Sequence, residues 1–401
     1  MVRRAFDKLN ARMKILVSAG EASGDRYAAQ VVEELRKRLP GADFFGCAGR
    51  RLRAAGVRPI VRSEDLAVVG VFEVITHIPR IYREYRRLTE RIEQERPDLA
   101  ILTDSPDFHL RLAKKLRRAG VPTFYYVAPQ VWAWRKGRIR QLRSFVDQVL
   151  CIFPFEEAFF GQHGVRTTYV GHPLADEEPV SVDRPNYFRQ HGFDEGLPLV
   201  ALLPGSRRGE AERHLPVLRE TIGRLRRESG LNLVLPASST TGAAFFRERI
   251  ADLGVQVTEE GAAEALAHAD LALVASGTAT VEAALIGTPM VVFYRVSTAS
   301  WAVGKLLVDV PFYSMVNLLA GRAVVPELIQ GDCTPERLAA EAKRLLQDAA
   351  LRKRMSEDLE KVAKTLRGAR PAAERAAEVI CEKWQCTGTP ENTSKDSLPV
   401  A

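Results

Sequence analysis

The stretch Pro97-Asp-Leu-Ala-Ile-Leu-Thr-Asp-Ser-Pro-Asp-Phe-His109 decides the fold, because a buried strand runs directly into a helix there. Leu99 to Leu102 form a short apolar run without helical spacing, which is typical of a strand covered on both faces of a parallel sheet. Ser105 and Pro106 predict the N-cap and first residue of the next helix, with Asp107 in its first turn. The pattern predicts an α/β fold.

Asp104 stands between this strand and this helix, where open α/β sheets place ligands and catalytic groups. Capping of the turn is the simpler interpretation for an isolated aspartate at a strand end. A carboxylate in this position could also serve as a general base. The rest of the chain has to decide between the two interpretations.

Length and composition indicate a soluble globular protein with two domains, since 401 residues are too many for one ordinary core. No apolar run approaches bilayer length, and Met1 to Arg12 is a basic lead-in without the apolar core of an export signal. The five cysteines are scattered, with no Cys-x-x-Cys pair. We therefore expect a cytoplasmic protein without a metal site.

The net charge of +8 is unevenly distributed. No acidic residue lies between Asp107 and Asp147, and the basic residues there are Arg111, Lys114, Lys115, Arg117, Arg118, Arg135, Lys136, Arg138, Arg140 and Arg143. Such a run could bind phosphates of nucleic acid, anionic lipid or a substrate, or it could be a solvated helix face. The preceding apolar stretch Leu66–Ile78 predicts either core packing or contact with a membrane.

The first half opens with a strand at Lys14–Ser18, a glycine loop at Gly20–Asp25 and a helix to about Leu39, as in nucleotide-binding sheets. The spacing is neither Gly-x-Gly-x-x-Gly nor a phosphate loop, so we expect no dinucleotide and no other cofactor. The further elements expected in this half are strands at 43–47, 59–61, 121–127, 148–152 and 167–170 and a long helix at 78–95.

One loop of this half contains Trp132, Trp134 and Arg135, after the strand at 121–127. These side chains could line a ligand cleft, or the tryptophans could wedge a helix against the sheet. The residues alone leave both interpretations open.

Gly171 to Pro185 is short and rich in proline and acids, which predicts a linker between domains. The βα pattern then restarts with a strand at Leu199–Leu203, a glycine loop at 204–210 and a helix at 211–229. Later elements are strands at 232–235, 256–258, 271–274 and 290–293, helices between Pro335 and Trp384, and a polar tail predicted to be disordered.

The strand at 271–274 leads into Ser276-Gly277-Thr278 and a helix. Hydroxyls, a glycine and the free N–H groups of a helix start suit a phosphate, although simple capping would explain the same residues. Arg207, on the glycine loop at 204–210, would lie at the same sheet edge and could pair with a diphosphate. Glu282 is placed to accept hydrogen bonds from ribose hydroxyls.

Together these motifs resemble the lipid-A-disaccharide synthase family, in its order and over roughly Met13 to Arg370. The matching segments are Gly20–Asp25, Asp104–Phe108, Val131–Arg135, Gly171–Asp176, Leu203–Arg207, Ser276–Thr278 with Glu282, and Asn317–Arg322. The chain departs from the usual pattern at Ser105, where many members have alanine, and at Met315-Val316, where Leu-Pro is usual.

The resemblance implies two Rossmann-like domains facing across a cleft, the GT-B glycosyltransferase fold. The implied units are a basic extension at 1–12, an acceptor domain at 13–175, a UDP-sugar donor domain at 186–370, a C-terminal helix at 371–386 and a tail at 387–401. The implied activity joins UDP-2,3-diacylglucosamine to 2,3-diacylglucosamine 1-phosphate with inversion, giving the lipid A disaccharide and UDP.

The resemblance also implies site roles. Asp104 would be the base, with Glu21 as its rival, and Ser23, Gly24, Trp132, Trp134 and Arg135 would face the acceptor. The donor residues would be Ser206, Arg207, Ser276, Gly277, Thr278, Glu282 and Asn317. We expect a peripheral enzyme on the anionic inner face of the inner membrane. We expect no binding of nucleic acid, and a homodimer is compatible with the resemblance. A UDP-N-acetylglucosamine 2-epimerase of the same fold is the alternative.

Overall fold

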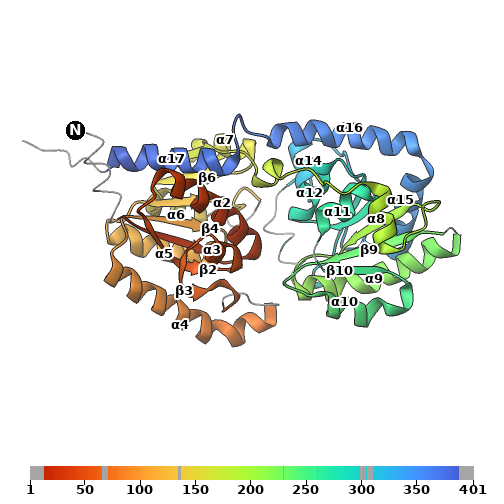
Figure 1. The fold of residues 1–401 in the computed structure, drawn as a ribbon, viewed down its shortest axis with the longest axis horizontal. Coiled ribbons are helices and arrows are strands. Elements are labelled where there is room, and N and C mark those ends of the chain that lie inside the picture. The colour runs from red at the N-terminus through yellow and green to blue at the C-terminus, as the bar shows by residue number, and fades with distance from the viewer. Residues whose placement is uncertain are drawn as a thin grey trace, which may run out of the picture.

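Two parallel β-sheets, one in each half of the chain, organise the computed structural model (Figure 1). The structure describes residues 13–65, 71–133, 137–228, 230–259, 261–298, 301, 304 and 310–387. The expectations for residues 1–12, 66–70 and 388–401 and for Trp134, Arg135 and Lys136 lie outside these ranges. Within them, no helix is both long and apolar enough to cross a membrane.

The first sheet has the strand order β3-β2-β1-β4-β5-β6-β7, with every pair parallel. Its strands are β1 Lys14–Ala19, β2 Asp43–Ala48, β3 Arg58–Arg62, β4 Leu99–Thr103, β5 Thr123–Tyr126, β6 Gln148–Cys151 and β7 Thr167–Tyr169. The helices of this half are α2 Ala22–Arg38, α3 Arg50–Ala54, α4 Val71–Glu95, α5 Pro106–Arg118, α6 Arg138–Phe145 and α7 Pro154–Gln162.

The second sheet has the order β10-β9-β8-β11-β12-β13 and is also parallel. Its strands are β8 Leu199–Leu203, β9 Asn232–Ala237, β10 Gln256–Glu259, β11 Leu271–Ala275, β12 Met290–Tyr294 and β13 Glu327–Ile329. The accompanying helices are α8 Arg184–His191, α9 Arg208–Glu228, α10 Ala243–Ile250, α11 Ala262–His268, α12 Thr278–Ile286, α14 Met315–Ala320, α15 Pro335–Gln347 and α16 Ala349–Leu366.

The central strands are buried along their whole length, which is why they are continuous apolar runs. In both sheets the order runs outward in two directions from the first strand of the half. The reversal falls between β1 and β4, where Ala19 pairs with Thr103, and between β8 and β11, where Leu203 pairs with Val274. The fold thus has two topological switch points, where doubly wound sheets bind ligands.

Three helices begin earlier than predicted: α2 at Ala22, α4 at Val71 and α9 at Arg208. Both predicted glycine loops were therefore too long. Gly24, for example, was assigned to a loop but lies inside α2. A Cβ there would lie 1.6 Å from Oδ2 of Asp104, so Gly24 is needed for close approach and not for a turn. The sequence analysis also missed β13, which has only three residues.

The predicted start of α5 at Ser105 and Pro106 is confirmed, although Ser105 does not act as an ordinary cap. Ser105 occupies the N-cap position, but its hydroxyl does not cap the helix and its backbone is left-handed, with φ 39°. Pro106 and Asp107 do stand in the first turn, as predicted.

The C-terminal helix α17, Ala372–Thr387, packs on the first sheet's half although it follows the second sheet in sequence. Figure 1 shows it lying beside the N-terminal elements, beyond the end of α16. Ile380 is fully buried in the core that contains β1 and α2. The amide of Ala372 donates to Asp176 Oδ2 at 2.6 Å and so fixes the start of the helix. The two halves are therefore joined by two chain crossings.

Replacement of Ile380 by alanine should lower the free energy of unfolding by about 2–5 kcal/mol, because it leaves a cavity in the first half's core. Urea unfolding followed by circular dichroism measures the loss. Lys383→Ala, on an exposed position of the same helix, is the matched control and should change little. Equal unfolding midpoints for Ile380→Ala and the control would show that α17 does not contribute to this core.

Candidate active site

A cleft between the two halves is lined by loops from both switch points. The first half contributes Gly20, Glu21, Ser23 and Ser105, and the second half contributes Gly205, Ser206, Arg207, Ser276, Gly277, Thr278 and Glu282. Most of the residues predicted from sequence for the active site are thus brought together, although they come from widely separated parts of the chain.

Asp104 lies directly behind this lining and is half-buried. Its Oδ1 accepts a hydrogen bond from the amide of Gly20 at 3.0 Å, and its Oδ2 accepts one from the amide of Glu21 at 3.1 Å. The carboxylate thus holds the β1 loop, and it lies directly behind residues that line the cleft.

The backbone of Asp104 and Ser105 is strained, since both residues adopt left-handed conformations with φ 58° and 39°. The carbonyl oxygen of Asp104 accepts hydrogen bonds from Nδ1 of His109 at 2.8 Å and from the hydroxyl of Tyr125. His109 and Tyr125 are fully buried in the described structure. These two donors hold the strained turn that aims the Asp104 side chain.

Burial, together with a smaller contribution from the negative charge of Glu21, raises the pKa of Asp104 to about 8. The two backbone donors act against this rise but do not cancel it. A carboxyl group that titrates near neutral pH can accept a proton far more effectively than an ordinary aspartate.

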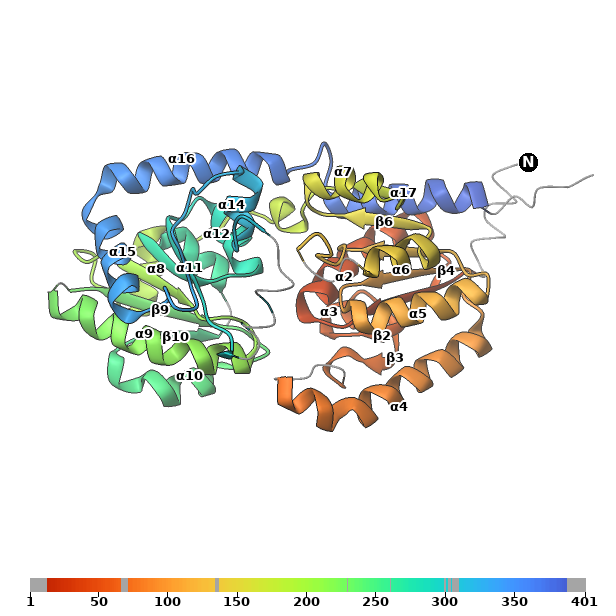
Figure 2. The ribbon, with the colours of Figure 1, turned by 180° about the vertical axis from the view of Figure 1, so that it is seen from behind.

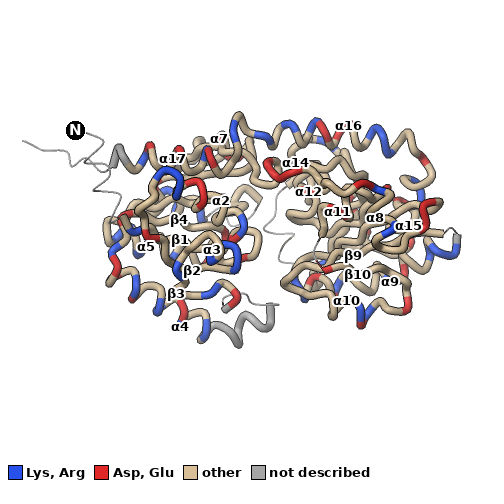
Figure 3. Tube along the Cα trace, viewed as in Figure 1, with Lys and Arg blue, Asp and Glu red and all other residues tan. Residues whose placement is uncertain are grey.

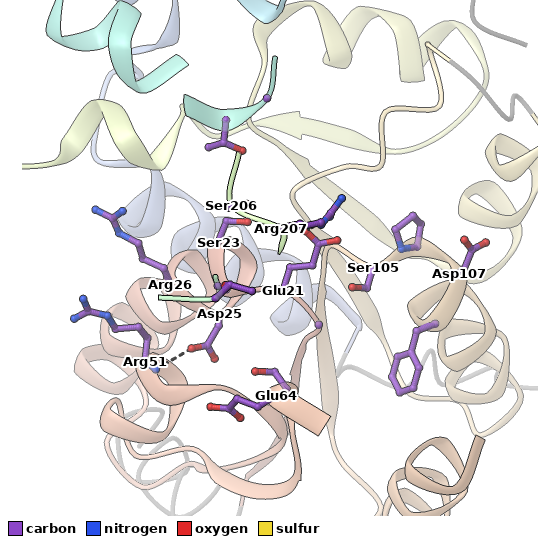
Figure 4. A pocket seen from close by; sticks show the side chains of 18 of the residues that line it. Glu21, Ser23, Asp25, Arg26, Arg51, Glu64, Ser105, Asp107, Ser206 and Arg207 are labelled. Carbon is purple, nitrogen blue, oxygen red and sulfur yellow. Dashed lines mark hydrogen bonds and ion pairs between the residues drawn. The ribbon is translucent and has the colours of Figure 1, made fainter. Parts of the chain in front are cut away.

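An ion pair joins the two halves across the cleft. Arg207 Nη2 lies 2.7 Å from Oε2 of Glu21, and Figure 4 shows the two side chains pointing toward one another. Both side chains remain about half exposed, at 54% and 45%. Such an exposed pair contributes little stability, so an anionic ligand could replace Glu21 as the partner of Arg207.

The second half holds its cleft loops by backbone contacts. The carbonyl of Ser206 accepts hydrogen bonds from Ser238 Oγ at 2.9 Å and Thr241 Oγ1 at 2.8 Å. The sequence predicted that the Ser276 hydroxyl is available to a phosphate. Instead, Ser276 Oγ donates its proton to the carbonyl of Tyr313 at 2.9 Å. Thr278, by contrast, is exposed at the start of α12.

Glu282 lines the cleft one turn into α12 and is half-buried. Burial raises the pKa of its carboxyl group above the ordinary value. The hydrogen bond from ribose hydroxyls to Glu282 stays a prediction.

Asn317 does not belong with the cleft residues, and its expected donor-binding role has to be corrected. It is 1% exposed, and its Nδ2 donates to the carbonyl of Val325 and to Glu327 Oε1. Its Oδ1 accepts from the amides of Val324 and Val325. The side chain therefore braces the segment before β13, and this chain's Met315-Val316 lies buried beside it.

Trp132 wedges elements together, one of the two alternatives that the sequence left open. Its Nε1 donates to Oε1 of the buried Glu156 at 3.1 Å, and its ring meets Phe155 edge-on. Burial raises the pKa of Glu156 to about 8. The expectation of a cleft-lining Trp132 is therefore not supported.

Sequence reasoning missed His109, Tyr125 and His214, which hold the cleft loops from within the core. Each lies on an element whose apolar pattern indicates only core packing, so no local signal distinguished them. Among the described residues, no group of three or more His, Cys, Asp or Glu side chains is arranged to hold a metal ion.

Comparison with solved structures supports the two-domain fold. UDP-GlcNAc 2-epimerase from Neisseria meningitidis bound to UDP-GlcNAc superposes with a TM-score of 0.63, 12% identity and coverage of 93% of this chain and 100% of the other. The calicheamicin glycosyltransferase superposes with a TM-score of 0.59, 16% identity and coverage of 94% and 100%. At such low identity these likenesses establish the GT-B fold alone.

Sequence comparison is more specific. The chain matches the family described as lipid-A-disaccharide synthetase over residues 15–382. Lipid-A-disaccharide synthase from Solibacter usitatus is 59% identical over 369 residues, which cover 92% of this chain and 97% of that protein. The enzyme of the same name from Myxococcus xanthus is 46% identical, with the same coverage of both chains. These matches do not favour the epimerase alternative, and the chain belongs to the lipid-A-disaccharide synthase family.

Proposed function

We propose that this protein is an inverting glycosyltransferase that joins UDP-2,3-diacylglucosamine to 2,3-diacylglucosamine 1-phosphate, releasing UDP and the lipid A disaccharide 1-phosphate. Membership of the lipid-A-disaccharide synthase family supports the reaction. The single structural observation that carries the proposal is the meeting of two switch-point loops, with a raised-pKa carboxyl group on one side and Arg207 on the other.

Asp104 is the proposed base. It takes the proton from the 6-hydroxyl of the acceptor, the hydroxyl oxygen bonds to the anomeric carbon of the donor, and the bond from that carbon to the diphosphate breaks. A single displacement inverts the anomeric configuration. Glu21 lies nearer the open cleft and remains the rival for this role.

Arg207 and the start of α12 are the proposed diphosphate site. Charge develops on the leaving UDP, and a guanidinium with free helix N–H groups stabilises it. When the diphosphate binds, Arg207 exchanges Glu21 for the phosphate oxygens. The same exchange frees Glu21 beside Asp104, where its charge keeps the pKa of the base high.

We further propose that the first half rests on an anionic membrane surface. Figure 3 shows Lys and Arg in both halves, so net charge alone does not single out one face. The acid-free run is distinctive because it falls on α5 and α6, which Figure 2 shows next to one another. Arg111, Lys114 and Arg118 are exposed along one face of α5.

Arg117 and Arg138 are less suitable for lipid contact. Arg117 pairs with Asp147 at 2.9 Å, and Arg138 is 8% exposed and pairs with Asp107. The membrane proposal therefore rests on the exposed face of α5.

The direct test of function incubates the protein with both lipid substrates and detects the disaccharide and UDP by mass spectrometry. Free 2-epimer formed from UDP-N-acetylglucosamine, with no disaccharide, would contradict the proposal.

Asp104→Asn should keep UDP binding but lower kcat by roughly 10²–10⁴-fold, as expected for removal of a general base. In the wild type, kcat/KM should rise as the pH increases through about 8, because only the deprotonated carboxylate of Asp104 accepts a proton. A variant with wild-type turnover would remove Asp104 from the mechanism.

Glu21→Gln separates the two candidate bases. If Asp104 is the base, removal of the neighbouring negative charge lowers its pKa, and the rising limb of the pH–rate profile moves to lower pH with turnover retained. If Glu21 is the base, turnover is lost and no limb remains to shift. A pH–rate profile of both variants decides between these results.

Arg207→Ala should weaken UDP binding by about 1.5–3 kcal/mol, because a charge-assisted contact is lost. Calorimetric titration with UDP measures the change. Arg208→Ala is the matched control, since the neighbouring Arg208 pairs with Glu212 at 3.1 Å. Unchanged affinity for UDP in Arg207→Ala would place the diphosphate elsewhere.

Replacement of Arg111, Lys114 and Arg118 by glutamine should lower sedimentation with vesicles that contain anionic lipid, since each basic residue near such a surface contributes about 1 kcal/mol. The control replaces Lys353, Arg354 and Arg367, which are exposed in the other half, and removes the same charge. UDP binding should be unaffected in both variants. Equal sedimentation of the two variants would show that the basic residues on α5 form a solvated helix face and do not bind lipid.

A further inference from the structure

Each half of the molecule has one fully buried histidine beneath its cleft loop. His109 lies on α5 behind Asp104, and His214 lies on α9 behind the loop that contains Ser206 and Arg207. Both are 0% exposed, so neither can touch a substrate. Their hydrogen bonds show what they do instead.

His109 joins two loop ends of the first switch point. Its Nδ1 lies 2.8 Å from the carbonyl oxygen of Asp104, and its Nε2 lies 2.7 Å from the hydroxyl of Ser18 in β1. A carbonyl oxygen only accepts, so Nδ1 must have the proton and donate it. The remaining nitrogen of the neutral ring accepts from Ser18. Burial, which lowers the pKa of His109 to about 4, maintains this neutral form.

His214 repeats the arrangement at the second switch point. Its Nδ1 lies 2.7 Å from the carbonyl oxygen of Pro204, at the end of β8, and its Nε2 accepts from the amide of Arg295 at 3.0 Å. A backbone amide only donates, so the neutral tautomer with the proton on Nδ1 is fixed from both sides. His214 thus ties the loop after β8 to the segment after β12.

We propose that His109 and His214 are paired positioning residues: His109 fixes the backbone that aims Asp104, and His214 fixes the loop that presents Arg207 to the donor. The inference rests on the roles proposed above for these two side chains. Neither histidine transfers a proton. Each acts by donating one hydrogen bond from Nδ1 to the carbonyl that precedes or forms the functional turn.

The geometry predicts different kinetic signatures for the two sites. Displacement of the base affects only the chemical step, so loss of the His109 tether should lower kcat and leave the KM for UDP-sugar unchanged. Displacement of the Arg207 loop affects donor binding, so loss of the His214 tether should raise that KM and weaken UDP binding. Because small misplacements in a site are costly, we expect changes of roughly tenfold to a hundredfold.

The experiment compares asparagine and glutamine at each position. Asparagine places its amide nitrogen near the former Nδ1 and can still donate to the carbonyl, whereas glutamine places it near the former Nε2 and cannot. Full-length His109→Gln should lose kcat, and His109→Asn should recover most of it. His214→Gln should lose UDP affinity by calorimetry, and His214→Asn should recover it.

Matched controls come from the chain itself. His163 also approaches a backbone carbonyl through Nδ1, that of Phe159 at 2.8 Å, but it is exposed at the end of α7. His163→Gln should change neither parameter. Tyr125→Phe removes the second donor to the Asp104 carbonyl and keeps the ring, so it should lower kcat as His109→Gln does. If the His109 variants do not fold, Tyr125→Phe still tests whether the hydrogen bonds to the Asp104 carbonyl are required for a normal kcat.

Equal losses in the asparagine and glutamine variants, or the same effect of both histidines on kcat and on UDP affinity, would overturn the inference. So would a wild-type kcat in Tyr125→Phe. Asp104→Asn in the same assay distinguishes failure of this inference from failure of the proposed function. If Asp104→Asn is inactive while His109→Gln has a normal kcat, the role inferred for His109 is wrong and the role of Asp104 as base is retained. If Asp104→Asn is active, Asp104 is not the base, and the role of His214 is still tested separately by UDP calorimetry.

Discussion

The contact between the Asp104 carboxylate and the amides of Gly20 and Glu21 is the interaction on which the first half of the site depends. It ties the loop after β1 to the turn after β4, the two strands between which the sheet reverses its order. The contact needs Gly24, because any side chain there would overlap the carboxylate. It also needs a left-handed turn at two ordinary residues, held by buried donors beneath.

The same constraint gives the carboxyl group its chemistry. Enclosure by the β1 loop removes solvent from Asp104, and Glu21 adds a like charge, so the pKa rises toward the range in which a base is useful. The strain and the desolvation both disfavour the folded state. They are tolerated because β1 and β4 are buried at the centre of the sheet, where the surrounding core determines the conformation.

The second half presents an open, exposed loop in place of a strained and enclosed one. Arg207 is about half exposed, and its cross-cleft partner Glu21 is equally accessible. An exposed pair is weak and can be exchanged for a diphosphate at little cost, whereas a buried pair could not. The two halves thus place a preorganised carboxylate opposite an exchangeable cation, an arrangement suited to proton removal on one side and leaving-group stabilisation on the other.

Much of this organisation could be predicted from the sequence alone. Continuous apolar runs such as Leu99–Leu102, each followed by glycine or a small polar residue, determined the parallel strands and the positions of the loops at their carboxyl ends. The motifs around Asp104, Arg207 and Thr278 identified the family, whose fold and name the comparisons confirm. Local patterns suffice for these features because burial and helix initiation act on neighbouring residues.

Only the tertiary structure decided which polar groups remain available and which are consumed. Asn317 belongs to a family motif, yet its amide is fully used in bracing Val324, Val325 and Glu327. Conversely, His109 and His214 look like ordinary core positions in sequence and prove to hold the cleft loops. The hydrogen-bonded residues Ser18 and His109 lie 91 residues apart in the chain, so residue spacing gives no information about such partners.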